Sequence, residues 1–101
     1  MDKESAGMLT VEQVQRAVAE FYDLRVADMT SKKRPANIAL PRQIAMYLSR
    51  RNTEYSTPAI GECFNRNHAT ILHAVNAVEK RLAEDEECRQ AIDVLERKLK
   101  R

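Results

Sequence analysis

The 101-residue sequence contains few residues that favour turns: two glycines and three prolines. So few turn residues leave little room for hairpins, and no stretch alternates apolar and polar residues as a half-buried strand does. No apolar run approaches the ~20 residues that a membrane-spanning helix needs. Residues 1–8, MDKESAGM, lack the apolar core of a signal peptide. We therefore expect an all-α domain that acts in the cytoplasm without a membrane partner.

Potential metal ligands and disulfide partners are equally scarce. Cys63 and Cys88 lie far apart in the chain and lack metal-ligand spacing. We interpret them as helix residues that fill core space, because free cysteine is commonly buried and a reduced compartment needs no disulfide. His68 and His73 are five positions apart, whereas two zinc ligands on one helix face need i, i+4 spacing. We expect no metal site.

The sequence also lacks the groups that define an enzyme. Two histidines and scattered carboxylates make no set of nucleophile, base and orienting group. The phosphate-binding pattern GxxxxGK[S/T] does not occur. We expect no catalysis and no cofactor in this chain, so any ATP would be bound by an ATPase domain that is absent from it.

Basic residues, in contrast, are concentrated in one part of the chain, although the formal net charge is only +2. The first 28 residues hold six acidic residues against three basic ones. Residues 29–53 hold no acidic residue and six basic ones: Lys32, Lys33, Arg34, Arg42, Arg50 and Arg51. A basic segment of this kind is typical of a nucleic-acid contact, and the alternative is a solvated run of charge.

Residues 56–82 have the pattern of two helices joined by a polar corner at residues 65–67. Thr57 is a suitable N-cap for the first helix, with Pro58 at its first position, and Asn67 is a suitable N-cap for the second. Gly61 interrupts the first helix, which a close crossing of the two helices would explain. Phe64 is expected to fill the core beneath the corner.

The second helix separates apolar from polar residues. Its 4-3-4 spacing predicts a buried face of Ile71, Val75, Val78 and Leu82. Its first turn, from Arg66 to Thr70, and His73 one turn later are expected to face outward. In a helix-turn-helix, the second helix enters the major groove with an exposed polar first turn of this kind.

The remaining pattern predicts a helical scaffold around this unit. Thr10 and Gln13 form a capping box for a first helix whose apolar face ends at Phe21. Val26 and Met29 are expected to face inward. A basic loop over residues 31–39 precedes a helix from Pro41 to Arg51, and Asp85 begins the last helix. We expect residues 1–9 to be a linker or frayed terminus and residues 10–101 to be the DNA-binding domain.

Four ordered motifs carry a family resemblance: KKRP at 32–35, PRQIAMYL at 41–48, STPAIG at 56–61 and RNHATILHA at 66–74. Over residues 31–74 the chain closely resembles the C-terminal DNA-binding domain of the bacterial replication initiator DnaA. The resemblance implies a Trp-repressor-like domain of five to six helices with a preceding basic loop. It also implies that a single copy binds a short asymmetric AT-rich box in double-stranded DNA at a replication origin.

The resemblance assigns roles to individual residues. It implies that Arg34 enters the minor groove, that Gln43 and Arg50 hold phosphates, and that Arg66, His68 and Thr70 fall on matching positions of the recognition helix. Together with the pattern, it gives an expected DNA-binding set of Lys32, Lys33, Arg34, Arg42, Gln43, Arg50, Thr57, Pro58, Arg66, Asn67, His68, Ala69, Thr70 and His73.

The sequence departs from the family at the corner. Family members usually have FGGRDHTT, whereas this chain has FNRNHAT at 64–70, which is one residue shorter. Asn67 replaces an aspartate, which accepts from a cytosine amino group, and asparagine prefers adenine. Ala69 replaces a threonine and loses a hydroxyl. The base preference is therefore relaxed or shifted, which leaves two alternatives open: a helix-turn-helix transcriptional regulator with another target, and a protein-interaction module.

Overall fold

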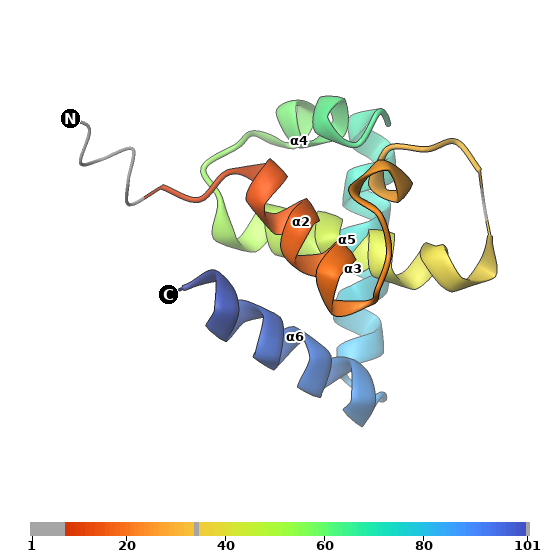
Figure 1. Ribbon diagram of the computed structural model, residues 1–101, viewed down its shortest axis with the longest axis vertical. Helices are drawn as coiled ribbons and strands as arrows, with labels where there is room; N and C mark the ends of the chain where they lie inside the picture. Colours follow the sequence, from red (N-terminus) through yellow and green to blue (C-terminus); the bar gives the residue numbers. More distant parts are fainter. Residues whose placement is uncertain (1–7, 34, 101) are drawn as a thin grey trace.

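The computed structural model describes residues 8–33 and 35–100 (Figure 1). This part contains five α-helices and one 3₁₀ helix and no strand, which confirms the all-α prediction. The elements are α2 (Val11–Phe21), η1 (Val26–Met29), α3 (Ala36–Asn52), α4 (Thr57–Cys63), α5 (His68–Leu82) and α6 (Glu86–Leu99). The linker predicted for residues 1–9 lies outside the described residues except for Met8 and Leu9. None of the described helices is long and apolar enough to cross a membrane.

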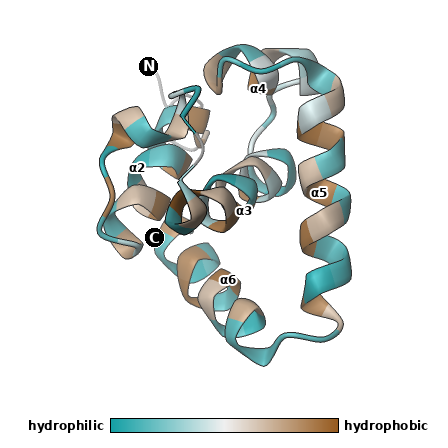
Figure 2. Cartoon of the chain, turned by 90° about the vertical axis from the view of Figure 1, so that its right-hand side faces the viewer, coloured by the Kyte–Doolittle hydropathy of each residue, from teal (hydrophilic) through white to brown (hydrophobic). Residues whose placement is uncertain are grey.

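Helix α3 is the centre of the fold. Every other element packs against it, so that α2, α4, α5 and α6 surround it when it is viewed nearly end-on (Figure 2). Ile44, Ala45 and Leu48 are completely buried there. Because α3 carries the core on several sides, a displacement of this helix would disturb every other packing contact in the domain.

Helix α3 begins five residues earlier than the predicted start at Pro41. Pro35 is its N-cap, with extended backbone, and a proline is tolerated there because no helical N–H is needed. Pro41 therefore lies inside the helix, where it cannot donate to the carbonyl oxygen of Asn37. Ile38 is buried and anchors the additional turn. The predicted loop over residues 31–39 is thus wrong for its second half.

Helix α2 has the predicted capping box. The Thr10 hydroxyl accepts from the Gln13 N–H at 3.1 Å, and the Gln13 side chain accepts from the Thr10 N–H at 2.8 Å. The predicted inward positions of Phe21 and Val26 are wrong, since these side chains are 37% and 44% exposed. Met29 is completely buried, as expected.

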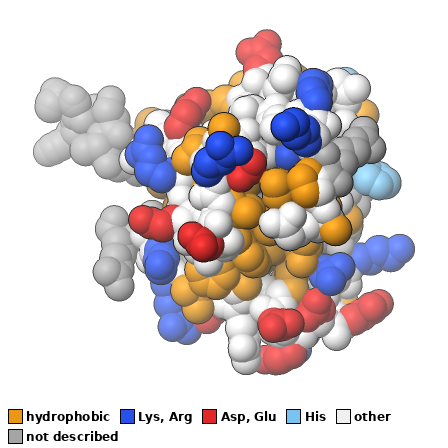
Figure 3. All heavy atoms as spheres, turned by 45° about the vertical axis from the view of Figure 1, so that its right-hand side comes forward, with side chains coloured by type: hydrophobic (Ala, Val, Ile, Leu, Met, Phe, Trp, Pro, Cys, Tyr) orange, Lys and Arg blue, Asp and Glu red, His pale blue; other side chains and the backbone are white. Residues whose placement is uncertain are grey.

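Phe21 belongs to an apolar groove of about 510 Å³ between α2, the start of α3 and α6. Leu40 and Val94 also line this groove. Figure 3 shows an apolar area on this side of the molecule, with Asp and Glu side chains at its lower edge. Apart from Arg81 near the C-terminal end of α5, the residues that line this groove lie outside the helix-turn-helix.

Helix α6 packs against the core through Ile92 and Leu95, which are buried. It begins at Glu86, one residue after the predicted start, because Asp85 is its N-cap: the Asp85 carboxylate accepts from the Cys88 N–H at 3.2 Å. Cys88 and Cys63 are both free thiols, in agreement with their interpretation as packing residues. Burial raises the pKa of each thiol, which keeps both protonated near neutral pH.

Candidate nucleic-acid interface

The helix-turn-helix consists of α4, α5 and the corner between them. Ser56, not Thr57, caps α4: its hydroxyl accepts from the Ala59 N–H at 3.2 Å. The prediction was wrong by one residue because serine and threonine are both good caps and only the backbone geometry selects between them. Thr57 and Pro58 thus form the first turn of α4, with Thr57 half-buried and Pro58 exposed.

The short corner is built on one left-handed residue. Asn65 has φ of 59°, a conformation that asparagine tolerates better than most non-glycine residues. The chain can then turn sharply, and the Arg66 N–H donates to the Gly61 carbonyl oxygen at 2.8 Å. Phe64 is completely buried beneath the corner, as predicted. Asn65 therefore performs the role that glycine would otherwise have in this turn.

The first turn of α5 is capped and exposed, as the sequence predicted. The Asn67 side-chain oxygen accepts from the Thr70 N–H at 3.0 Å and from the Thr70 hydroxyl at 3.2 Å. His68 and Ala69 are exposed, and so is His73 one turn later. These side chains are accessible for contacts with a partner.

The buried face of α5 differs from the prediction in detail. Ile71 and Val78 are completely buried, but Val75 and Leu82 are only partly buried. Ala74, which was not predicted, takes an inward position at 3% exposure. The helix turns about 100° per residue, so a small rotation about its axis exchanges one neighbouring position for another.

Leu72 is an exposed residue that the sequence analysis missed. It is 43% exposed on α5, one position before His73. The available signal was its place between the two predicted apolar positions of the helix, at 71 and 75. An apolar side chain here adds hydrophobic area to the polar surface around the first turns of α5.

Arg42 does not lie on the outer surface, so this prediction was wrong. It is only 6% exposed. Its Nε donates to the Asp28 carbonyl oxygen at 3.0 Å, its Nη2 donates to the same oxygen, and its Nη1 donates to the Lys33 carbonyl oxygen at 3.1 Å. The planar guanidinium can serve several carbonyl oxygens at once, so Arg42 holds the basic loop against α3.

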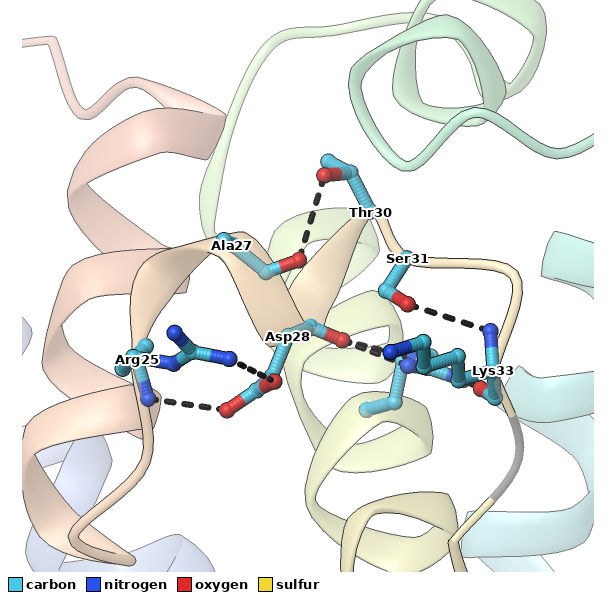
Figure 4. Close-up of polar contacts among 7 residues, drawn as sticks. Arg25, Ala27, Asp28, Thr30, Ser31 and Lys33 are labelled. Atoms are coloured by element: carbon cyan, nitrogen blue, oxygen red, sulfur yellow. Dashed lines mark hydrogen bonds and ion pairs between the residues drawn. The ribbon is translucent and has the colours of Figure 1, made fainter.

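The start of the loop is further ordered by local contacts (Figure 4). The Asp28 carboxylate accepts from the Arg25 N–H at 3.0 Å and pairs with the Arg25 guanidinium at 3.8 Å. The Ser31 hydroxyl accepts from the Lys33 N–H at 3.0 Å. Lys32 and Lys33 are both exposed on this framework. The predicted role of Arg34 lies outside the described residues.

Arg66 is half-buried and its guanidinium contacts the protein itself. Nη2 donates to the Ser31 carbonyl oxygen at 2.8 Å, and Nη1 donates to the carbonyl oxygens of Phe64 and Asn65 at 3.0 and 3.3 Å. The Lys32 ammonium group also donates to the Asn65 carbonyl oxygen, at 2.9 Å. The expected outward position of the Arg66 side chain was therefore wrong, and the loop and the corner are in direct contact.

Gln43, Thr70 and His73 lie together. They line a cavity of about 230 Å³ between α3 and α5, together with Arg42 and Arg66. Arg50 does not line this cavity, but it is exposed near the C-terminal end of α3. The structure thus brings residues from α3, α5 and the corner to one shallow depression beside the recognition turn. Among the described residues, no three His, Cys, Asp or Glu side chains are arranged to hold a metal ion.

A helix-turn-helix with this corner and loop agrees with the results of sequence comparison. The family model described as the bacterial dnaA protein helix-turn-helix matches residues 11–78. The chain belongs to this family. The matched DnaA-type region contains the loop, the corner and the first turns of α5.

Individual proteins show the same relation. The chain is 52% identical over 97 residues to the chromosomal replication initiator protein DnaA of Bordetella pertussis (strain Tohama I), covering 95% of this chain and 21% of that protein. It is 52% identical over 93 residues to the DnaA of Herminiimonas arsenicoxydans, covering 91% of this chain and 20% of that protein. The chain therefore spans about a fifth of the length of these curated relatives.

A solved structure is also similar. The crystal structure of a DNA replication initiation factor matches with a TM-score of 0.79 and 31% sequence identity, covering 89% of this chain and 28% of that one. The DnaA-type fold therefore extends beyond the residues matched by the family model.

Proposed function

We propose that this DnaA-type domain binds double-stranded DNA at specific sites in a replication origin, for the initiation or regulation of chromosome replication. The proposal rests on one observation: the basic loop is hydrogen-bonded to the corner that leads directly into the capped, exposed first turn of α5. Membership of the family and the names of the relatives, which are replication initiators, support the same function.

In this proposal the first turn of α5 enters the major groove, with His68, Ala69 and Thr70 toward the base edges. Asn67 stands at the start of that turn. Its side-chain oxygen already accepts two hydrogen bonds from Thr70, so its amide nitrogen supplies the donors for a base acceptor. Ala69 supplies a methyl group for a thymine methyl.

The surrounding residues hold the DNA backbone. Gln43, Thr70 and His73 surround the depression between α3 and α5, where their polar atoms suit phosphate oxygens. Lys33 and Arg50 are exposed and add positive charge, and Pro58 at the start of α4 contacts the adjoining backbone. Arg34, which follows Lys33 directly in the sequence, is the residue that the family resemblance assigns to the minor groove.

The proposed target is a short asymmetric AT-rich box bound by one monomeric copy of the domain, at the nucleoid in the bacterial cytoplasm. A single helix-turn-helix has no two-fold symmetry to match a palindrome. Neither metal nor cofactor takes part in this binding. The energy for opening the duplex would come from an ATPase module elsewhere.

Fluorescence anisotropy tests the proposal. The chain is titrated into a duplex with the family box and into a scrambled duplex, at one near-physiological salt concentration. We expect a preference of about 10³ or more for the box, as ordinary specific recognition gives. His68→Ala should reduce that preference while thermal stability stays unchanged. Equal, salt-sensitive affinity of the unaltered chain for both duplexes would contradict origin-box recognition.

A second candidate is a helix-turn-helix transcriptional regulator with a different target sequence. The observation that favours it is the use of the Asn67 oxygen in the cap, since it leaves a donor where the usual aspartate offers an acceptor. Selection of binding sites from random duplexes distinguishes the two candidates. Enrichment of an unrelated sequence would favour the regulator.

A further inference from the structure

The basic loop and the helix-turn-helix corner are joined by two reciprocal hydrogen bonds. A side chain of the loop, Lys32, donates to the main-chain carbonyl oxygen of Asn65 in the corner at 2.9 Å. A side chain of the corner, Arg66, donates to the main-chain carbonyl oxygen of Ser31 in the loop at 2.8 Å. Each segment thus supplies both a donor and an acceptor, although they lie more than 30 residues apart in the sequence.

Arg66 makes the larger contribution to this junction. Its guanidinium also donates to the carbonyl oxygens of Phe64 and Asn65, so one planar group joins three carbonyl oxygens from two segments. A lysine ammonium group is a point charge on a flexible stem and lacks this fork geometry. These hydrogen bonds use three of the five N–H donors of the guanidinium, so a direct contact of Arg66 with a base or a phosphate is the alternative that the test must exclude.

The two buried or half-buried arginines of this region have separate tasks. Arg42 fastens η1, at Asp28, and the loop, at Lys33, to α3. Arg66 fastens the start of the loop, at Ser31, to the corner that precedes the recognition turn. Loss of Arg42 therefore releases the loop from the scaffold, whereas loss of Arg66 releases it from the DNA-reading helix.

We propose that Arg66 is a positioning residue that couples the basic loop to the first turn of α5, so that minor-groove and major-groove contacts form together. This inference rests on the proposed function. A loop fixed in advance at the correct distance from α5 loses less conformational entropy on binding than a loop that moves independently. Arg66 thus raises affinity and specificity through the loop without being a base contact.

The test uses DNA altered only in the minor groove. In one duplex the adenines of the box segment that faces the loop are replaced by 2,6-diaminopurine, which adds an amino group to the minor-groove edge and keeps the major-groove edge of adenine. The unaltered chain should bind this duplex about tenfold or more weakly than the box. The added amino group is a donor that an A·T minor groove does not present, and it lies in the groove that the loop is proposed to enter. Arg66→Met should weaken box binding by about tenfold. It should also reduce the ratio of the affinity for the box to the affinity for the diaminopurine duplex to about twofold or less.

Arg50→Met is the matched control. Arg50 is an exposed arginine of α3 without a contact to the loop or the corner among the hydrogen bonds of the described residues. Its substitution should weaken binding to both duplexes equally and leave their ratio as in the unaltered chain, since a phosphate contact carries no base information. If the ratio of the two affinities also stays unaltered in Arg66→Met, the proposal is overturned and Arg66 contacts the DNA directly.

Two further variants keep the test decisive if Arg66→Met unfolds, which circular dichroism reports. Arg66→Lys and Lys32→Met each remove part of the junction, and both should lower the ratio between the duplexes. Unaltered ratios in both variants would overturn the coupling. Failure of the unaltered chain to prefer the box over a scrambled duplex would refute the proposed function itself. Preference for the box without sensitivity to diaminopurine would refute the coupling alone.

Discussion

A Cβ atom added at Gly61 would lie 2.6 Å from the carbonyl oxygen of Arg66. Real Cβ atoms essentially never approach another heavy atom so closely. The backbone of α4 therefore lies directly against the corner, where the Arg66 N–H donates to the Gly61 carbonyl oxygen. This contact explains why a helix retains glycine despite its propensity cost of about 1 kcal/mol relative to alanine.

Gly61→Ala should destabilise the domain by about 1–3 kcal/mol, because the atom that would have to move is backbone rather than a flexible side chain. Thermal unfolding followed by circular dichroism measures the effect, and each kcal/mol corresponds to about 4–8 °C in a domain of this size. The specific affinity for DNA should fall as well, since the angle between α4 and α5 changes. If Gly61→Ala instead stabilises the domain through its better helix propensity, the backbone of the corner can shift away from the new Cβ atom without loss of stability.

Asn67→Asp should change the preferred base without weakening the helix. Aspartate caps a helix as well as asparagine does, and one of its oxygens can replace the acceptor that Thr70 uses. The second oxygen then accepts from a cytosine amino group, which should shift the preference toward cytosine by about 1–3 kcal/mol. Affinities for four duplexes that differ at the contacted base pair measure this shift.

Asn67→Ser provides the control for that experiment, since serine keeps the cap and has no amide. An identical ranking of the four bases in the asparagine and aspartate forms would show that the shortened corner directs residue 67 away from the bases.

Ser49→Ala should stabilise the domain. Ser49 is completely buried, and its hydroxyl oxygen has no hydrogen-bond partner among the described residues. Removal of this hydroxyl eliminates an uncompensated desolvation cost and improves helix propensity, for a gain of about 1 kcal/mol. The matched substitution Ser56→Ala should have the opposite sign, because it removes the cap of α4 and costs about 1 kcal/mol. An equal change in the free energy of unfolding of both variants would indicate that the buried, unpaired hydroxyl of Ser49 does not affect stability.

Glu96 should make the stability depend on pH. Burial raises the pKa of this carboxyl, but hydrogen bonds from Asn52 and Arg51 outweigh burial and hold the pKa below its ordinary value of 4.5. A carboxyl with a lowered pKa in the folded state stabilises the protein above its unfolded pKa, and this contribution is lost as the pH falls through the folded value. Glu96→Gln should therefore cost about 1 kcal/mol at pH 7 and less near pH 3.

Thermal melts of both proteins at these two pH values measure the difference. A constant difference across the pH range would show that Glu96 contributes through packing rather than through its charge. Arg51 and Asn52, both in α3, donate to the Glu96 carboxylate at 3.0 and 3.1 Å, so the expected loss concerns the attachment of α6 to the central helix.

The features predicted correctly from the sequence are mainly local ones. The capping box of Thr10 and Gln13 and the cap at Asn67 depend on residues three positions apart, and the structure confirms them. The crossing at Gly61 was also predicted, because a glycine inside a helix needs a steric reason.

The errors concern features that depend on distant contacts. Pro35 and Pro41 are each compatible with a helix start, and burial of Ile38 decides for Pro35. The sequence shows that Arg42 and Arg66 are charged but not where their guanidinium groups lie. Their acceptors are carbonyl oxygens 9 to 14 residues away for Arg42 and up to 35 residues away for Arg66. Only the folded chain brings these acceptors within reach.

The arginine contacts to the loop have a consequence for engineering. Arg42 and Arg66 bind carbonyl oxygens of the main chain, at Asp28, Ser31 and Lys33, and those oxygens are present whatever the side chains are. The path of the loop is therefore largely independent of the side chain at position 33, whereas the Ser31 hydroxyl itself accepts from the Lys33 N–H. Position 33 can be randomised in a library of variants while the loop keeps its course, so that new DNA preferences are selected on an unaltered scaffold.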